Sequence, residues 1–469
     1  MPTPPHEPLP AFPPGFLWGA AASAFQTEGA ADTDGKGPSG WDAFAAAGRI
    51  RDGADASRGT GFHARYREDV ALLAGLGADA FRFSVSWPRV VPGGRGPVNA
   101  RGLDFYDRLV DELCRHGITP APTLYHWDTP LPLDEAGGWL DRDTAERFAE
   151  YAAAVAARLA DRVGMWMTLN EPAEVTLLGY ALGEHAPGRR LLFDALPAAH
   201  HQLLAHGLAA RALRAAGARR VGVAVSHSPV LAAGEGEADR AAAGLYDTLT
   251  NHLFSDPLLT GAYPDGAIAS LMPGPVAEDL AVIAAPLDFY GVNYYHPMVV
   301  GAPKEGAPSG FGGVAVPGDL PFGLREYPGA ERTGFGWPVV PEGLRELLLG
   351  LDARYGRRLP PVVVTENGCS YDDAAEDHRR IAFHDAHLRS LHRAIGDGVD
   401  VRGYFTWSLT DNIEWVEGAA QRFGLVHVDY ATLERTPKAS YRWYREVIAA
   451  QKGRSHRTSQ TARTGPPSS

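Results

Sequence analysis

Two short stretches of the chain end in a glutamate after a run of apolar and β-branched residues. The first, MWMTLNEP, ends at Asn170 and Glu171, and the second, PVVVTENG, presents Glu366. Each run is typical of a buried strand in a parallel sheet, with the glutamate at its carboxyl end. One glutamate at the end of a strand is more often a solvated charge. Two carboxyl groups that face each other across a cleft are the groups that hydrolyse glycosidic bonds.

Because the two glutamates are far apart in the sequence, only a closed or strongly curved sheet can bring them together. Strand patterns occur eight times, separated by helical patterns with apolar residues three and four positions apart. The strand-like segments are residues 16–22, 78–87, 117–125, 165–171, 219–227, 287–295, 361–366 and 401–409. This alternation predicts an α/β fold, a single (β/α)8 TIM barrel with long βα loops over the C-terminal face. An open doubly wound sheet is the alternative, but neither a GxGxxG nor a Walker A motif follows an early strand.

The length of 469 residues suits one barrel with insertions, although length alone would suggest about three domains. We expect an N-terminal extension over residues 1–11, a catalytic barrel over 12–452 and a disordered tail over 453–469, where small polar residues prevail. The segment 297–339 is rich in Gly and Pro and has no clear periodicity. It is expected to form an ordered insertion over the mouth of the barrel.

Composition excludes several classes of function. The net charge is −12 and no basic cluster occurs, which argues against nucleic acid and anionic membranes as partners and favours a neutral small molecule. The two cysteines, Cys114 and Cys369, have no CxxC spacing, so a disulfide scaffold or zinc ribbon is excluded. No apolar run approaches the ~20 residues of a membrane span, and the N-terminus lacks a signal-peptide pattern. We expect a cytoplasmic protein, monomeric or homo-oligomeric.

In a barrel, chemistry gathers where the strands end. Nearly every predicted strand here ends in hydrogen-bonding or aromatic residues: Gln26, Arg82, His126, Trp127, Asn170, Glu171, Ser226, His227, Asn293, Tyr295, Glu366 and Trp407. Each of these residues could singly be a cap or a satisfied core group, but together they indicate a site for a polar ligand. A metal site would be the other use of histidines, yet no HExxH or comparable spacing occurs, so no metal is expected.

The motifs at these strand ends resemble glycoside hydrolase family 1, the β-glucosidases, from about residue 12 to about residue 448. In the family's order they are FLWGAAASAFQTEGA, RFSVSWPR, YHWDTP, TLNEP, HAPG, GVNYY, TENG, WSLTDNIEW and RFGLVHVD. The resemblance implies a retaining β-glycosidase that removes terminal β-D-glucosyl residues from β-glucosides and short oligosaccharides. It implies β-galactosyl or β-fucosyl residues as further substrates, a role in cellulose degradation, and no cofactor.

The same resemblance implies a role for each matching residue. Glu171 would be the acid/base and Glu366 the nucleophile, with Arg82, Tyr295 and Asn293 as further catalytic residues, the first two in contact with the nucleophile. The positions implied to bind the substrate are Gln26, His126, Trp127, Asn170, Trp337, Trp407, Glu414, Trp415 and Phe423. Among these, Asn170 would hold the sugar 2-hydroxyl, Trp407 would form a stacking floor, and Trp337 would lie on the aglycone side.

The sequence also bears on three alternative functions for a protein of this family. The 6-phospho-β-glycosidase branch of the family uses a lysine to bind phosphate, and residues 410–425 contain none, so free sugars are favoured. A catalytically silent sugar-binding module would be expected to lack Glu171 or Glu366, and both are present. A transglycosidase on the same site stays open, because it differs only in how an acceptor competes with water.

Overall fold

The computed structural model describes residues 7–264, 266–304, 309–311, 314–318, 320–372 and 375–463. Eight parallel strands close into a barrel in the order β1-β13-β12-β7-β5-β4-β3-β2. Their bounds are β1 (Leu17–Ala21), β2 (Ala80–Ser84), β3 (Thr119–Tyr125), β4 (Trp166–Asn170), β5 (Val221–Ser226), β7 (Phe289–Asn293), β12 (Val362–Asn367) and β13 (Val401–Trp407). The barrel closes because β1 pairs with β2 on one side and with β13 on the other. The predicted (β/α)8 fold is therefore confirmed.

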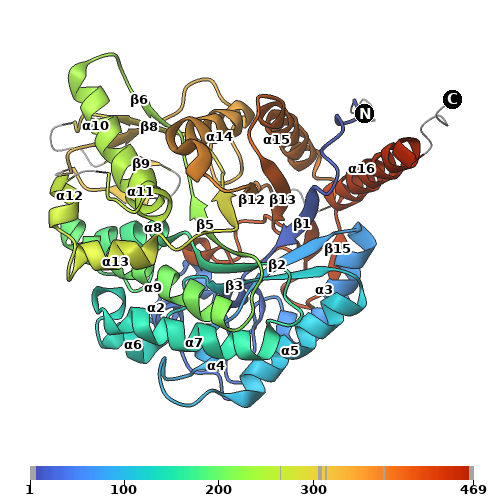
Figure 1. The fold of residues 1–469 in the computed structure, drawn as a ribbon, viewed down its shortest axis with the longest axis horizontal. Helices are drawn as coiled ribbons and strands as arrows, with labels where there is room; N and C mark the ends of the chain where they lie inside the picture. Colours follow the sequence, from blue (N-terminus) through green and yellow to red (C-terminus); the bar gives the residue numbers. More distant parts are fainter. Residues whose placement is uncertain are drawn as a thin grey trace.

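Helices surround the strands (Figure 1). The long ones are α3 (Phe62–Leu76), α5 (Ala100–Arg115), α7 (Asp143–Leu159), α9 (Leu196–Ala215), α14 (Pro341–Tyr355), α15 (His378–Gly396) and α16 (Ala439–Arg463). The βα connections add α1 (Ala24–Thr27), α2 (Gly40–Ala46), α4 (Trp87–Val90), α6 (Leu131–Glu135), α8 (Pro172–Glu174), α10 (Glu237–Asp247), α11 (Leu253–Thr260), α12 (Gly266–Ser270) and α13 (Val276–Ile283). Shorter 3-10 and π segments include η3 (Val175–Leu182), η4 (Leu192–Ala195), η5 (Thr248–His252) and η7 (Trp415–Glu417). Within the described residues, no helix is long and apolar enough to cross a membrane.

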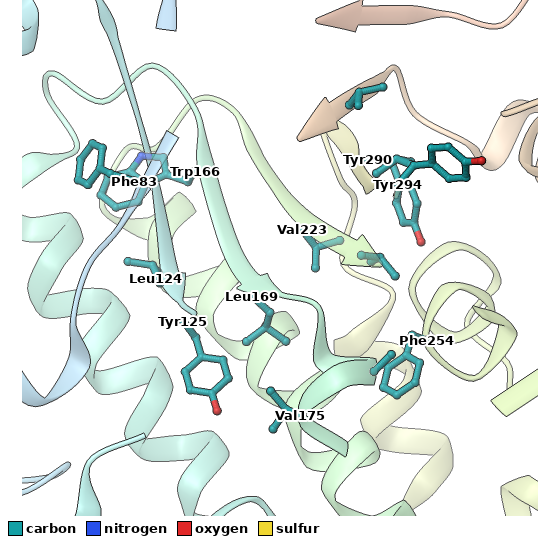
Figure 2. Close-up of a cluster of buried hydrophobic side chains, with 14 of the residues drawn as sticks. Phe83, Leu124, Tyr125, Trp166, Leu169, Val175, Val223, Phe254, Tyr290 and Tyr294 are labelled. Atoms are coloured by element: carbon teal, nitrogen blue, oxygen red, sulfur yellow. The ribbon is translucent and has the colours of Figure 1, made fainter. Parts of the chain in front are cut away.

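The hydrophobic core has two layers because strand side chains alternate between the two faces of the barrel wall. The larger layer lies between the strands and the helices, and Figure 2 shows part of it, with Trp166, Leu169 and Val223 on the strands. The smaller layer takes one or more side chains from seven of the strands and fills the barrel interior: Ala21, Ala80, Ala121, Met165, Met167, Phe289, Val363, Phe405 and Trp407, with Phe423 above them. A filled interior fixes the positions of the strand ends, where the candidate site lies.

All eight predicted strands are present, with ends that differ from the prediction by up to three residues. The largest difference is in the segment predicted over 78–87, where β2 stops at Ser84 and Trp87 instead begins α4. Pro88 at the second position of this helix explains the change, because proline favours the first turn of a helix and cannot donate within a central strand.

The insertion after β7 forms small strands instead of a plain loop. These are β8 (Met298–Gly301), β9 (Ser309–Phe311), β10 (Val314–Val316) and β11 (Gly323–Arg325), and β8 and β11 join β6 (Val230–Ala232) in a three-stranded sheet. Within the insertion, residues 305–308, 312–313 and 319 lie outside the described residues.

The C-terminal segment differs from the expected disordered tail. Helix α16 continues to Arg463, while residues 464–469 lie outside the described residues. The residues beyond 452 include Arg, Gln and Ala, which favour helix, and a single Gly costs about 1 kcal/mol. The backbone can therefore extend a helix that the preceding residues have already nucleated. The proposed division into an extension, a barrel and a tail stays a prediction.

Candidate active site

Glu366 lies in β12 and is held by groups from two other parts of the barrel. Its Oε1 accepts a hydrogen bond from Nη1 of Arg82, in β2, within a buried ion pair. Its Oε2 accepts a hydrogen bond of 2.7 Å from the phenol of Tyr295, which follows β7. Arg82 and Glu366 are 1% and 3% exposed. Since both oxygens are held, the orientation of this carboxylate is set before any ligand binds.

Glu171 follows β4 and is the N-cap residue of α8. Its backbone has φ 48° and ψ 60°, the left-handed region that residues with a Cβ rarely adopt. Its Oε1 accepts a hydrogen bond of 2.8 Å from Nδ2 of Asn293, and its Oε2 accepts one of 3.2 Å from Nδ2 of Asn170. Such a conformation costs about 1–3 kcal/mol and persists where the surrounding structure holds it, often at a functional site.

The pKa of the Glu171 carboxyl lies well above its ordinary value. Burial is the largest cause, followed by the negative charges of Glu366 and Glu174. The hydrogen bond from Asn293 and the charge of Arg82 act in the opposite direction but are smaller. A buried carboxyl that retains its proton beside an ion-paired carboxylate is the combination that acid-assisted displacement at a sugar carbon requires.

The amides of Asn170 and Asn293 form a network that fixes which atom of each faces which neighbour. Oδ1 of Asn170 accepts hydrogen bonds from Nη2 of Arg82 and, at 3.0 Å, from Nδ2 of Asn293. Oδ1 of Asn293 accepts from the hydroxyl of Thr365 at 2.6 Å. The amide nitrogens of both residues are thereby directed at Glu171. Thr365 is a site residue that the sequence pattern presented only as part of a buried strand.

His126 carries an unpartnered ring nitrogen at the site. Burial and the charge of Arg82 lower the pKa of His126 well below its ordinary value, so the ring is neutral. Its Nε2 lies 3.1 Å from Nδ2 of Asn170, which can only donate, so the proton must be on Nδ1. Nδ1 is buried and has no hydrogen-bond partner among the described residues. Because His126 lines the cavity, this N–H is available to a hydrogen-bond acceptor on a ligand.

Glu414 is a third buried carboxyl of the site. Burial and the negative charges of Glu366 and Glu417 raise its pKa to about 8, and hydrogen bonds from Gln26 and Trp407 act in the opposite direction. Nε2 of Gln26 lies 3.4 Å from Oε2 of Glu414 and also donates to the carbonyl of Ile413 at 2.9 Å. Gln26 is thus fully buried behind Glu414. A direct contact between Gln26 and a sugar stays a prediction.

Aromatic rings surround these polar groups. Trp407 lies nearly parallel to the ring of His126, with 5.8 Å between the ring centroids. Trp415 packs on Trp127 at 4.3 Å, and Trp337 packs on Tyr295 at 5.3 Å. Flat apolar surfaces with polar groups at their edges suit a sugar, whose hydroxyls are polar and whose ring faces are apolar.

These side chains lie around one cavity of about 430 Å³. Ten of the fourteen residues expected at the site line it: His126, Trp127, Glu171, Tyr295, Trp337, Glu366, Trp407, Glu414, Trp415 and Phe423. The other four, Gln26, Arg82, Asn170 and Asn293, lie behind them and donate hydrogen bonds to the carboxyl groups that line the cavity. The structure therefore brings all fourteen residues together, while their individual roles stay predictions.

Glu174 is a cavity-lining carboxyl that the sequence reasoning missed. It stands three residues after Glu171 in PAEVTLLGYAL, a run that is otherwise mostly apolar. The sequence did contain a signal for Glu174, because it is a charged residue three positions after a catalytic candidate, and residues at this spacing are neighbours on one face of a helix. As for metals, no group of three or more His, Cys, Asp or Glu side chains in the described part of the chain could hold an ion.

Comparison with known proteins agrees with this geometry. The glycosyl hydrolase family 1 model matches residues 9–453. Thermostable beta-glucosidase B of Thermobispora bispora is 46% identical over 450 residues, which cover 93% of this chain and 90% of that protein. A bifunctional beta-D-glucosidase/beta-D-fucosidase of Bifidobacterium breve is 40% identical over 463 residues, with 94% and 99% covered.

Two solved structures are also similar to this chain, in sequence and in fold. The psychrophilic beta-glucosidase of Micrococcus antarcticus has a TM-score of 0.87 at 45% identity, covering 94% of this chain and 98% of that chain. The family 1 β-glucosidase of Thermotoga maritima in complex with isofagomine lactam has a TM-score of 0.88 at 36% identity, covering 94% and 99%. The family match spans nearly the whole chain, and the relatives are similar over nearly their whole length. This chain therefore belongs to glycosyl hydrolase family 1.

Proposed function

We propose that this chain is a retaining β-glucosidase with Glu366 as the nucleophile and Glu171 as the acid/base. The observation that carries the proposal is the contrast between two carboxyls at one cavity. Glu366 is held in an ion pair with Arg82, whereas the pKa of Glu171 is raised by burial and by the charge of Glu366. These are the surroundings that a nucleophile and a proton donor need.

In the first step, an oxygen of Glu366 bonds to the anomeric carbon while the bond from this carbon to the aglycone oxygen breaks. Glu171 gives its proton to the departing oxygen. The glycosyl ester removes the negative charge of Glu366, which is one of the causes that raise the pKa of Glu171. Glu171 then releases its proton more easily and is ready to act as a base.

In the second step, water attacks the anomeric carbon from the side that the aglycone has left. Glu171 takes the proton of this water, and the ester bond to Glu366 breaks. Two inversions give a product of the original β configuration. Asn170 lies beside both Glu171 and Arg82 and would bind the 2-hydroxyl of the sugar during both steps. The hydrogen bond between Asn170 and this hydroxyl would be stronger in the transition state than in the bound substrate.

We also propose a substrate range of β-D-glucosides, including short oligosaccharides, with β-D-fucosides and β-D-galactosides as further substrates. The bifunctional relative from Bifidobacterium breve supports the fucoside assignment. Comparing kcat/KM for the 4-nitrophenyl β-D-glucoside, fucoside and galactoside tests this range. A role in cellulose degradation and a cytoplasmic location are part of the same proposal, and two free cysteines agree with a reducing compartment. Monomeric and homo-oligomeric states are both compatible with it.

The first test is the configuration of the first sugar released from an aryl β-D-glucoside, followed by proton NMR. Initial β-glucose is expected, because double displacement retains configuration. Initial α-glucose would exclude Glu366 as a nucleophile, and no release would favour a sugar-binding module. Measuring released aglycone against released glucose over time separates hydrolysis from transglycosylation, since transfer to a sugar acceptor withholds glucose but not aglycone.

A second test addresses the acid role directly. Glu171→Ala is expected to impair the first step strongly for alkyl glucosides and weakly for dinitrophenyl glucosides, because a good leaving group needs little protonation. The readout is kcat/KM for both substrates with the same enzyme preparation. An equal loss on both would remove Glu171 from the role of acid.

A further inference from the structure

The cavity extends well beyond the residues placed around the sugar. Its remaining lining is mostly apolar, and we call this part the apolar chamber: Leu177, Leu178, Ala181, Leu182, Leu192, Phe193, Ala195, Leu196, Leu249, Met298, Val316, Leu320, Phe322 and Leu324. Phe193 is 43% exposed, which is unusual for a large hydrophobic side chain and gives the chamber an apolar edge open to solvent.

The walls of the apolar chamber come from separate parts of the chain. The π-helix η3 follows α8, the short helix that Glu171 caps, and η4 and the start of α9 pack against η3. The insertion after β7 contributes residues of β8, β10 and β11 together with Leu320 and Phe322. Polar side chains, among them Ser228, Thr250 and Asn251, also line the cavity, but a sugar hydroxyl that faced the leucines and phenylalanines of the chamber would have no partner, which costs free energy. An apolar group of similar or larger size would instead be removed from water.

Three carboxyl residues line this part of the cavity, Glu174, Glu184 and Glu417, and Glu174 is the one that lies beside Glu171 in the chain. Glu174 lies one turn beyond Glu171 on the same side of the chain, and its backbone N–H donates to the carbonyl of Glu171 at 3.1 Å. Its side chain is partly exposed and lines the cavity, so its open surface faces the cavity. Ser226, another lining residue, is close enough to Glu174 to lower the pKa of its carboxyl, although burial raises this pKa by more.

A phenol stands near the same carboxyl. The charge of Glu174 acts on Tyr246, whose ring also lines the cavity and packs edge-on against Phe322 at 5.2 Å. The cation of the lining, Arg49, donates to the carbonyl of Gly183 at 2.6 Å and lies 4.1 Å over the ring of Phe44. Arg49 is therefore engaged elsewhere, and the carboxyl keeps hydrogen-bonding capacity for a ligand.

We propose that the apolar chamber binds a bulky apolar aglycone that carries a hydroxyl on its edge, and that Glu174 selects this hydroxyl. The inference rests on the proposed β-glucosidase activity and adds the class of aglycone. Burial raises the pKa of Glu174, which favours a neutral hydroxyl over a strongly hydrated group as its partner. The carboxyl accepts the hydrogen bond of the hydroxyl while the flat or branched apolar part contacts the leucines and phenylalanines of the chamber.

The apolar part of the inference is tested with alkyl glucosides, whose leaving groups are similarly poor. We expect the wild-type kcat/KM for octyl β-D-glucoside to exceed that for ethyl β-D-glucoside by about tenfold or more, since each added methylene enters an apolar pocket. The kcat/KM for octyl β-D-glucoside is also expected to exceed that for cellobiose. Leu178→Ser should reduce the octyl to ethyl ratio. If cellobiose is the better substrate, or if the Leu178 variant leaves the octyl to ethyl ratio unchanged, the proposal that the chamber binds an apolar aglycone is wrong.

The role of Glu174 is tested with 2-naphthyl and 6-hydroxy-2-naphthyl β-D-glucosides. Glu174→Leu is expected to lower the ratio of kcat/KM for the hydroxylated over the plain substrate by about tenfold, because a site built for a hydroxyl loses its partner. Glu174→Gln keeps the volume and part of the hydrogen bonding, so it should lower the ratio less, and it serves if the Leu variant does not fold. Comparing each variant with wild type cancels the different reactivities of the two leaving groups.

Glu135→Gln is the matched control, because it removes an exposed carboxylate that does not line the cavity. Its ratio should equal that of wild type. An equal change on both naphthyl substrates in the Glu174 variants would reduce Glu174 to a structural role and overturn the assignment. The proposed β-glucosidase activity is tested independently of Glu174, and it is wrong if wild type does not cleave 4-nitrophenyl β-D-glucoside at all.

Discussion

At the scale of single residues, the two catalytic candidates differ in the charges that surround them. Glu366 accepts hydrogen bonds from a guanidinium and a phenol, whereas Glu171 accepts hydrogen bonds from two neutral amides and faces the negative charges of Glu366 and Glu174. A carboxylate beside a cation is stabilised in its charged form, and a buried carboxyl beside another carboxylate is stabilised in its neutral form. The different roles that we propose for these two identical side chains therefore follow from their neighbours.

Glu366→Gly is expected to lower the hydrolysis of aryl β-glucosides on the order of 10⁴-fold, since the attacking group is lost. The cavity left by the side chain should admit azide, which can attack from the same side. The product should then be the α-glucosyl azide, identified by proton NMR. Recovery of only the β-configured product on adding azide would contradict the role of Glu366 as nucleophile.

Glu174→Gln is expected to move the alkaline limb of the pH profile of kcat/KM to lower pH. The negative charge of Glu174 is one of the causes that raise the pKa of Glu171, alongside burial and Glu366, while Arg82 lowers it. Removing one negative charge lowers the pKa of the acid, so Glu171 loses its proton at a lower pH. The profile is measured with an unactivated glucoside, for which protonation limits the rate.

The control for this pH shift is Glu135→Gln, whose profile should coincide with that of wild type. An alkaline limb that stays in place or moves to higher pH in the Glu174 variant would show that Glu171 is not the group behind this limb. An acid limb that moves instead would point to a different titrating residue.

At the scale of elements, the site depends on how closely the ends of neighbouring strands approach. Gly368 follows β12 directly, and a Cβ at this position would lie 2.0 Å from the backbone oxygen of Trp407 at the end of β13. Backbone atoms cannot move aside as a flexible side chain can. The glycine therefore allows the strand that carries Glu366 and the strand that carries Trp407 to meet at the floor of the cavity.

Gly368→Ala is expected to lower the free energy of unfolding by about 1–3 kcal/mol, as overpacking does, and to lower kcat by displacing Glu366. Thermal unfolding and kcat measured together check both effects. Gly350→Ala, within α14, is the matched control. Nothing lies within 4 Å of a Cβ there, and alanine in a helix should add about 0.5–1 kcal/mol of stability. Wild-type stability and activity of the Gly368 variant would refute the close approach.

At the scale of the whole molecule, the segment that leads into β1 lies beside α16 (Figure 1). The side chain of Gln451, in α16, accepts a hydrogen bond from the N–H of Phe12 and donates one to the carbonyl of Pro10. Lys452 donates to the carbonyl of Gly77 at 2.7 Å and pairs with Asp79 at 2.6 Å. The last helix thus holds the segment that leads into β1, the strand at which the barrel closes.

Two truncations test whether stability depends on the contacts that α16 makes with the N-terminal segment or on the end of the helix. Removing residues 455–469 is expected to leave the unfolding midpoint and the activity unchanged, because it retains Gln451 and Arg454, which donate hydrogen bonds to the N-terminal segment. Removing residues 449–469 also deletes Gln451, Lys452 and Arg454, and the loss of their hydrogen bonds is expected to cost about 1–3 kcal/mol. Equal stability of the two truncated chains would contradict this role of α16.

The sequence by itself determined the fold class and the strands that carry the site. Hydrophobic periodicity is local, so the runs that end at Asn170 and at Glu366 identify strands, and the barrel follows from their number and alternation. The motifs predicted fourteen site residues, of which ten line one cavity and four lie behind these ten. Helix and strand ends were less well determined, as at Trp87 and in the last helix, because local propensity and tertiary packing compete there.

Only the tertiary structure decided the surroundings of each side chain. The left-handed backbone of Glu171 and the placement of Gln26 behind Glu414 depend on segments far apart in the sequence. The role that we propose for Glu174 depends on the apolar chamber, to which η3, η4 and described residues of the insertion all contribute. A pKa, an orphaned N–H or the shape of a pocket is a property of all neighbours at once, and sequence order does not contain these neighbours until the chain has folded.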